Sequence, residues 1–91
     1  MTAKTYTSVF DAIADTAQEA ANLRLRAEVM RHIARCIERK GWTQAEAAKH
    51  GGITQPRVND LVRGRLSRFS LDALVNIAAA MGLRVELRAA A

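Results

Sequence analysis

Residues 41–64 read GWTQAEAAKHGGITQPRVNDLVRG, and this stretch decides the fold class. It fits two short helices joined by one tight turn, because Gly52 supplies a permissive backbone and Ala48 lets the helices cross closely. Three aliphatic residues are expected to point inward at spacings of five and three and to anchor the second helix to the core, namely Ile53 just before it and Val58 and Leu61 on it. We therefore expect a helix-turn-helix, whose second helix enters the major groove of DNA.

Capping residues mark the ends of both expected helices. Thr43 and Glu46 have the spacing of a capping box, in which the threonine hydroxyl accepts a hydrogen bond from the glutamate amide. Thr54 is placed to cap the second helix, Pro56 suits its first turn, and Gly64 suits its C-terminal end. Caps alone also fit an ordinary helical hairpin, so the prediction depends on the small and apolar residues.

The whole chain has room for one domain. Its 91 residues are 49% hydrophobic and contain no apolar run approaching the roughly 20 residues that span a bilayer. The first residues lack the apolar core of a signal peptide, and Cys36 has no second cysteine to pair with. We expect a cytoplasmic, mainly α-helical domain over residues 1–91, made of an N-terminal arm (1–15), a helical domain (16–82) and a C-terminal strand (83–88).

Charge is unevenly distributed along the chain. The net charge is +5, but residues 1–22 contain one basic and three acidic residues, whereas residues 23–91 contain 13 basic and six acidic residues. The basic part is the part that contains the helix-turn-helix stretch. This points to a polyanionic partner, although a merely solvated basic surface has the same charge.

Helical patterns flank the central stretch. Ser8–Ile13 fits one helical turn, and a long helix is expected over about 17–40, capped by Thr16 and ended by Gly41. Another helix is expected over about 71–81, capped by Ser70. The apolar residues expected to face the core from the two longer helices are Ala20, Leu23, Leu25, Ala27, Val29, Met30, Ile33, Ala34, Cys36, Ile37, Leu71, Leu74, Val75, Ala78 and Met81.

The periodicity changes after Gly82. Residues 83–88 read LRVELR, so aliphatic and charged residues alternate as in a strand, and the aliphatic face consists of Leu83, Val85 and Leu87. No other part of the chain offers a partner strand. Because a lone strand leaves its backbone groups unpaired, we expect antiparallel pairing with a second copy, or otherwise a frayed tail.

The expected DNA contacts lie on the second helix and around it. Gln55 and Asn59 can make paired contacts with adenine, and Arg57 or Arg63 can bind guanine or phosphate. The further candidates are Thr43 and Gln44 at the start of the first helix, Thr54 and Pro56 at the start of the second, and Arg65 and Arg68 beyond it. Asp60 is expected to pair with Arg57 or Arg63, because DNA repels a carboxylate.

Other classes of function find little support. The chain shows no catalytic Ser/His/Asp or Cys/His arrangement and no phosphate-binding glycine loop, so we expect neither an enzyme nor a cofactor. His32 and Cys36 stand one helical turn apart but lack further metal ligands, which favours Cys36 as a core residue. An RNA-binding role stays open as an alternative, although the chain lacks the exposed aromatic residues that stack on single-stranded bases.

The motif resembles the helix-turn-helix of Xre and phage-repressor proteins, from Gly41 to Gly64 without a gap. With LRLRA at 23–27, FSLDAL at 69–74 and GLRVE at 82–86, residues 10–88 are similar to HigA-type antitoxins and their orphan relatives. Trp42 and Gly51 stand where that family more often has leucine.

The resemblance implies a five-helix, dimeric repressor that binds a palindromic operator. The positions that it assigns to DNA contacts are Gln44, Gln55, Pro56, Arg57 and Asn59. Many such proteins also neutralise a basic RelE/HigB-like toxin, and the acidic residues 1–22 offer a complementary surface. An orphan repressor without a toxin, a protein whose main role is toxin inhibition, and a first segment that only packs on its own domain remain alternatives.

Overall fold

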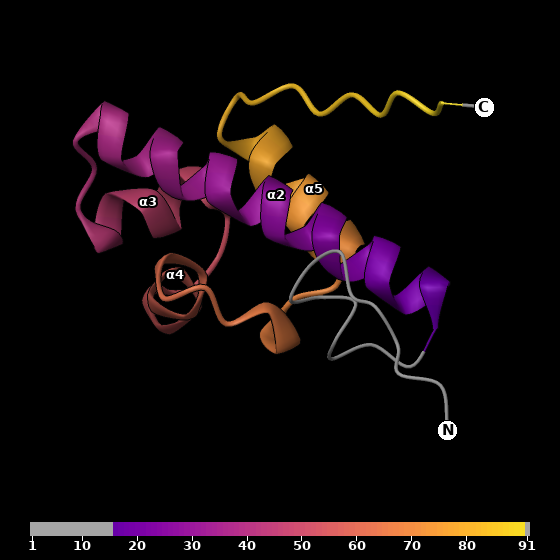
Figure 1. The fold of residues 1–91 in the computed structure, drawn as a ribbon. Coiled ribbons are helices and arrows are strands. Elements are labelled where there is room, and N and C mark those ends of the chain that lie inside the picture. The colour runs from indigo at the N-terminus through magenta and orange to yellow at the C-terminus, as the bar shows by residue number, and fades with distance from the viewer. Residues whose placement is uncertain (1–15, 91) are drawn as a thin grey trace.

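The computed structural model describes residues 16–90, which form four α-helices and one short 3-10 helix (Figure 1). The helices are α2 (Ala17–Lys40), α3 (Gln44–Gly51), α4 (Gln55–Val62), the 3-10 helix η1 (Leu66–Arg68) and α5 (Leu71–Ala80). The mainly helical fold class is confirmed. The further helical turn predicted at residues 8–13 lies outside the described residues.

Each of the four α-helices begins at a hydroxyl residue. The side-chain oxygen of Thr16 accepts a hydrogen bond from the Glu19 amide at 3.0 Å, and Ser70 accepts one from the Ala73 amide at 3.1 Å. Thr43 and Thr54 cap α3 and α4 in the same way. All four caps were predicted, and they explain why the predicted helix starts agree with the structure.

The core lies where α2 packs against the other helices. α2 contacts α5, α4 and η1, while α3 packs against both α4 and α5. The residues that form this core are Val29, Met30, Ile33, Cys36, Ile37, Ala47, Ala48, Val58, Leu61, Phe69, Leu74, Ile77, Ala78 and Met81. Residues from all four α-helices thus meet around one long helix.

The buried side of each longer helix differs in part from the predicted side. Leu23 and Ala27 of α2 are half-buried rather than buried. Phe69 and Ile77 are buried and were not among the predicted core residues. Leu25, Ala34, Leu71 and Val75 were predicted to face the core and are half-buried.

The C-terminal segment, residues 83–90, contains no strand within the described part of the chain. Its first residue is tied to α5, because the Leu83 amide donates to the Ala78 carbonyl at 2.8 Å. Beyond it the segment runs extended beside α2, on the side of α2 opposite α4 and η1 (Figure 1). The predicted strand pairing requires a second copy and stays a prediction.

Candidate nucleic-acid interface

The turn between α3 and α4 has the conformation that its glycines allow. Gly52 has a φ of +67°, in the left-handed region, and the Ile53 amide donates to the Ala48 carbonyl at 3.0 Å. Gly51 is buried, and a Cβ added there would lie 2.9 Å from Cε of Met81. The two glycines therefore have different roles. Gly52 closes the turn, and Gly51 lets α3 approach α5.

Two core residues fix the orientation of α4. Val58 is 0% exposed and Leu61 is 1% exposed, so the opposite side of this short helix points away from the domain. The surface that we call the outward face of α4 consists of Gln55, Pro56 and Asn59 together with Arg63, the residue that follows the helix. Asn59 is half-buried and the other three residues are exposed. The structure therefore brings these four predicted residues together on one surface.

The start of α3 is also open to a ligand. Thr43 and Gln44 are both exposed, as is Thr54 at the start of α4. The Thr43 hydroxyl accepts from the Glu46 amide at 3.1 Å and also lies 3.3 Å from Oε1 of Glu46. The free amides of a first helical turn suit a phosphate oxygen. The predicted role of this helix end is thus compatible with its exposure.

Trp42 and His50 connect the segment before α3 to the last turn of α3. Their rings stack with centroids 4.0 Å apart and an interplanar angle of 10°. Trp42 is also packed against the core from a half-buried position. The stack joins the residue just before the α3 cap to the last turn of the helix, a contact that the sequence analysis did not identify.

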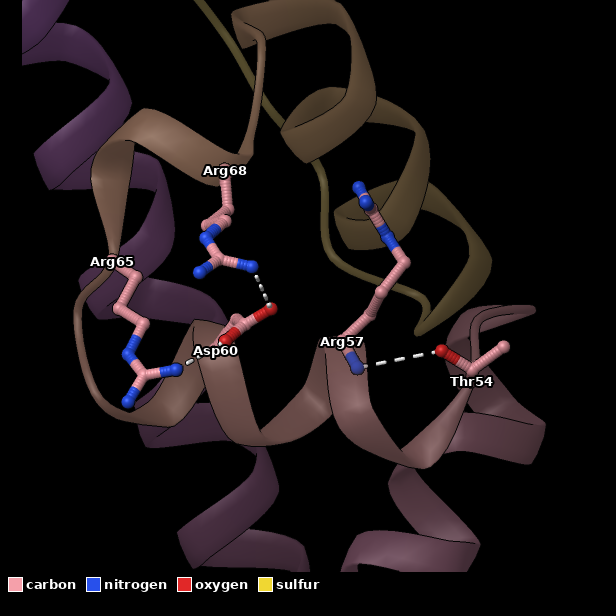
Figure 2. Close-up of polar contacts among 5 residues, drawn as sticks. All are labelled: Thr54, Arg57, Asp60, Arg65 and Arg68. Carbon is pink, nitrogen blue, oxygen red and sulfur yellow. Dashed lines mark hydrogen bonds and ion pairs between the residues drawn. The ribbon is translucent and has the colours of Figure 1, made fainter.

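The side chain of Arg57, which was expected to bind guanine or phosphate, packs against an aromatic ring instead. Its guanidinium carbon lies 4.6 Å from the centre of the Phe69 ring, and its side chain extends toward α5 (Figure 2). A guanidinium over an aromatic face is held by a cation–π interaction. Arg57 thus ties α4 to the residue that precedes the α5 cap, instead of standing free to meet a base.

Asp60 has different partners from those predicted. Its carboxylate accepts from Nη1 of Arg65 at 2.8 Å and lies 3.8 Å from Nη1 of Arg68 (Figure 2). The predicted pairing with Arg57 or Arg63 is wrong. The reason is that the chain reverses at Gly64, whose φ is +71°, and brings η1 back beside α4.

The basic turn, which we define as Arg65 to Arg68, is also held from α2. Nη1 of Arg26 donates to the Leu66 carbonyl at 3.2 Å and to the Phe69 carbonyl at 3.1 Å. Arg26 was not a predicted functional residue, because its partners are about 40 positions away in the chain. The guanidinium groups of Arg65 and Arg68 therefore sit on a turn anchored from two helices while remaining largely exposed.

The possible metal pair does not develop into a site. Cys36 is buried in the core, as predicted, and His32 is exposed on α2. Among residues 16–90 no cluster of three or more histidine, cysteine or acidic side chains is arranged to hold a metal ion. Within the same range, no helix is long and apolar enough to cross a membrane.

Comparison with protein families identifies the class of this chain. The sequence profile of a helix-turn-helix domain matches residues 12–90, and the chain belongs to this family. No curated protein gives a significant match to the sequence. The family supports a DNA-binding regulator, in agreement with the motif and with the exposed polar side of α4.

Proposed function

We propose that this protein is a sequence-specific repressor that binds DNA as a homodimer through the outward face of α4. The observation that carries the proposal is the contrast between the two sides of α4. Val58 and Leu61 are enclosed in the core, whereas Gln55, Pro56 and Arg63 are exposed on the other side. A short helix held in this way presents its first residues to the major groove.

The outward face offers groups for reading bases. The side-chain amides of Gln55 and Asn59 each place an N–H donor next to a carbonyl acceptor, which matches the major-groove edge of adenine. Arg63 suits guanine or a phosphate, and the ring of Pro56 offers an apolar surface for a thymine methyl group. These contacts would supply sequence discrimination, because base edges differ while phosphates do not.

Phosphate contacts would come from the flanking elements. Arg65 and Arg68 lie on the basic turn directly after α4, and the amides at Thr43 and Gln44 open α3. The pair of Arg68 with Asp60 is long, at 3.8 Å, and the Arg68 side chain is 61% exposed, so this guanidinium can turn to a phosphate at little cost. Arg57 serves in this proposal to hold α4 in place.

A double substitution tests the reading of bases. Replacing Gln55 and Asn59 by alanine removes both amides while leaving Val58 and Leu61 intact. Each good bidentate contact contributes about 1–3 kcal/mol of discrimination. We expect the ratio of operator affinity to scrambled-duplex affinity, measured by fluorescence anisotropy, to fall by about 100-fold, with little change in scrambled-duplex binding.

A matched control uses the same residue types elsewhere. Gln18 and Asn22 are exposed on the first turns of α2. Their replacement by alanine should leave the affinity ratio unchanged. If the Gln55/Asn59 variant discriminates as well as the wild type, the outward face does not read bases and the proposal fails.

An autorepressing antitoxin is the finer form of this proposal. It is supported by the resemblance to HigA-type antitoxins and by the acidic balance of residues 1–22, of which Asp11 and Asp15 lie outside the described residues. The partner would be a basic, RelE/HigB-like toxin. Rescue of growth when the protein is co-expressed with the neighbouring gene product tests this form. Without such a partner, the protein is an orphan cytoplasmic repressor and, in either form, a binding protein rather than an enzyme.

A further inference from the structure

The C-terminal segment has an open backbone edge. The bond from the Leu83 amide to the Ala78 carbonyl is the last backbone hydrogen bond in the described part of the chain. Residues 84–90 run extended past α2 without a neighbouring strand (Figure 1). An extended segment of this kind is a template for pairing with another strand.

The aliphatic side of this segment is incompletely covered. Leu83 packs against the core, but Val85 is 41% exposed and Leu87 is 75% exposed. A groove separates the segment from α2 and α5, and its apolar lining includes Leu25, Val29 and Ala78. Because the C-terminal segment lies across α2 from α4 (Figure 1), a partner bound along this segment leaves the outward face of α4 free.

The charged side of the segment shows which residues share a face. Nε of Arg84 lies 3.0 Å from Oε1 of Glu86, and both side chains are exposed. Arg84 and Glu86 therefore point to one side, and the aliphatic residues Leu83, Val85 and Leu87 alternate with them. The charges on this face are positive at Arg84, negative at Glu86 and positive at Arg88. Which charges meet in a two-fold pairing therefore depends on where the axis lies.

Symmetric antiparallel pairing allows only a few registers. Aliphatic residues lie opposite aliphatic residues only when the two-fold axis passes between the two copies of one residue. An axis midway between two successive residues puts aliphatic residues opposite charged ones. An axis at Arg84 sets Arg84 against itself. An axis at Glu86 sets Glu86 against itself and Arg84 against Arg88. Both place like charges directly opposite each other, which is destabilising.

An axis at Val85 satisfies both faces. Arg84 of each copy then lies opposite Glu86 of the other, and Leu83 lies opposite Leu87. Leu87, the most exposed leucine of the segment, thereby contacts Leu83, which already packs against the core. An axis at Leu87 also pairs opposite charges, Glu86 with Arg88, but it matches Val85 only with Ala89 and so buries less apolar surface.

We propose that two copies of this chain pair through residues 83–88 in an antiparallel ribbon whose two-fold axis passes between the two Val85 residues. The inference deepens the homodimer of the proposed function and rests on it. The second copy supplies the missing strand, covers Leu87, and turns the exposed Arg84 and Glu86 pair of each chain into a four-charge cluster across the axis.

Charge exchange between two variants tests the register. In R84E, positions 84 and 86 are both acidic, and in E86R both are basic. In the Val85 register each variant alone sets like charges opposite each other twice. We expect its dimer dissociation constant, measured by analytical ultracentrifugation, to rise by roughly tenfold or more. An equimolar mixture restores both opposite-charge pairs, so heterodimers should form with nearly wild-type affinity.

The outcomes separate the register from the function. If R84E dimerises like the wild type, the axis is not at Val85, where residue 84 lies opposite Glu86. Such a result would fit an axis at Leu87, where residue 84 lies opposite Ala90 and its charge has no partner. A mixture that binds no more tightly than its components also overturns the register. If the wild type stays monomeric but binds a single operator half-site, the ribbon is wrong and the DNA-binding function stands.

A cysteine pair gives an independent test in a Cys36→Ala background. V85C places two thiols directly opposite each other at the axis, within the Cα separation that a disulfide requires. L87C is the matched control, because its two thiols would be four residues apart along the ribbon. We expect V85C to form a disulfide-linked dimer under mild oxidation and L87C to form little. The reverse order would overturn the Val85 axis in favour of Leu87.

Discussion

Asp60 is an acidic residue of α4 beside the basic turn, and its ion pairs explain how a carboxylate there is compatible with the proposed DNA contacts. Its carboxylate is occupied by Arg65 at 2.8 Å and approached by Arg68 at 3.8 Å, while only 15% of its side chain is exposed. It neutralises part of the basic turn and holds it beside α4. In the proposed complex, Asp60 would limit binding to phosphates in general while positioning two cations.

Removing this charge should raise binding to any DNA. In Asp60→Asn the basic turn gains one net positive charge and loses its ion pairs with α4, while the hydrogen bonds from Arg26 remain. We expect the affinity for scrambled duplex to increase several-fold and the operator preference to fall. The slope of log K against log salt for scrambled duplex should steepen by up to about one unit. Both quantities are obtained from anisotropy titrations at several salt concentrations.

Asp72 provides the control for this substitution. It is an exposed carboxylate in the first turn of α5, apart from the basic turn. Asp72→Asn makes the same change in net charge. If it alters the operator preference as much as Asp60→Asn does, the effect comes from overall charge and the positioning role of Asp60 is contradicted.

At the scale of elements, the sequence predicted what local interactions determine. Helix starts agreed with the structure because each is set by a hydroxyl group and an amide three residues away, as at Thr16 and Ser70. The turn at Gly52 was predictable for the same reason. Interactions between residues close in the sequence could be predicted, and so could the helix ends that these interactions determine.

The contacts that hold the basic turn were not predictable in this way. Arg26 reaches carbonyl groups of Leu66 and Phe69 across the fold, and the stacking of Arg57 on Phe69 depends on how α4 meets α5. Helical spacing alone suggested Arg57 or Arg63 as partners of Asp60. The chain reversal at Gly64 brings Arg65 to that position instead, and the end of α4 predicted at Gly64 did not show which way the following residues would run.

The turn between α3 and α4 gives a prediction at this scale. Gly52 has a φ of +67°, and a Cβ added there would meet no atom within 4 Å. Gly52→Ala therefore isolates the cost of the left-handed backbone, about 1–2 kcal/mol of unfolding free energy. Urea denaturation should show this loss, with a smaller loss for Gly52→Asn, because asparagine tolerates the conformation better. Equal losses for both variants would show that the backbone conformation is not the cause.

At the scale of the whole molecule, α2 separates two surfaces. The outward face of α4 and the basic turn lie on one side of it, and the C-terminal segment with its apolar groove lies on the other (Figure 1). Dimer pairing through Val85 would therefore leave both copies of α4 available to DNA. The arrangement fits a two-fold protein on a palindromic site, in which symmetry doubles the contacts of one short helix.

The central claim is that the outward face of α4 reads a specific DNA sequence, and titration of the wild-type protein tests it most directly. The DNA upstream of its own coding region is compared with a scrambled duplex, and the complex is footprinted with hydroxyl radicals. We expect the upstream DNA to be preferred by roughly 1,000-fold or more at physiological salt. We also expect two protected patches on one side of the duplex, about one helical turn apart. Equal affinity for both duplexes, or no protection of the upstream DNA, would contradict it.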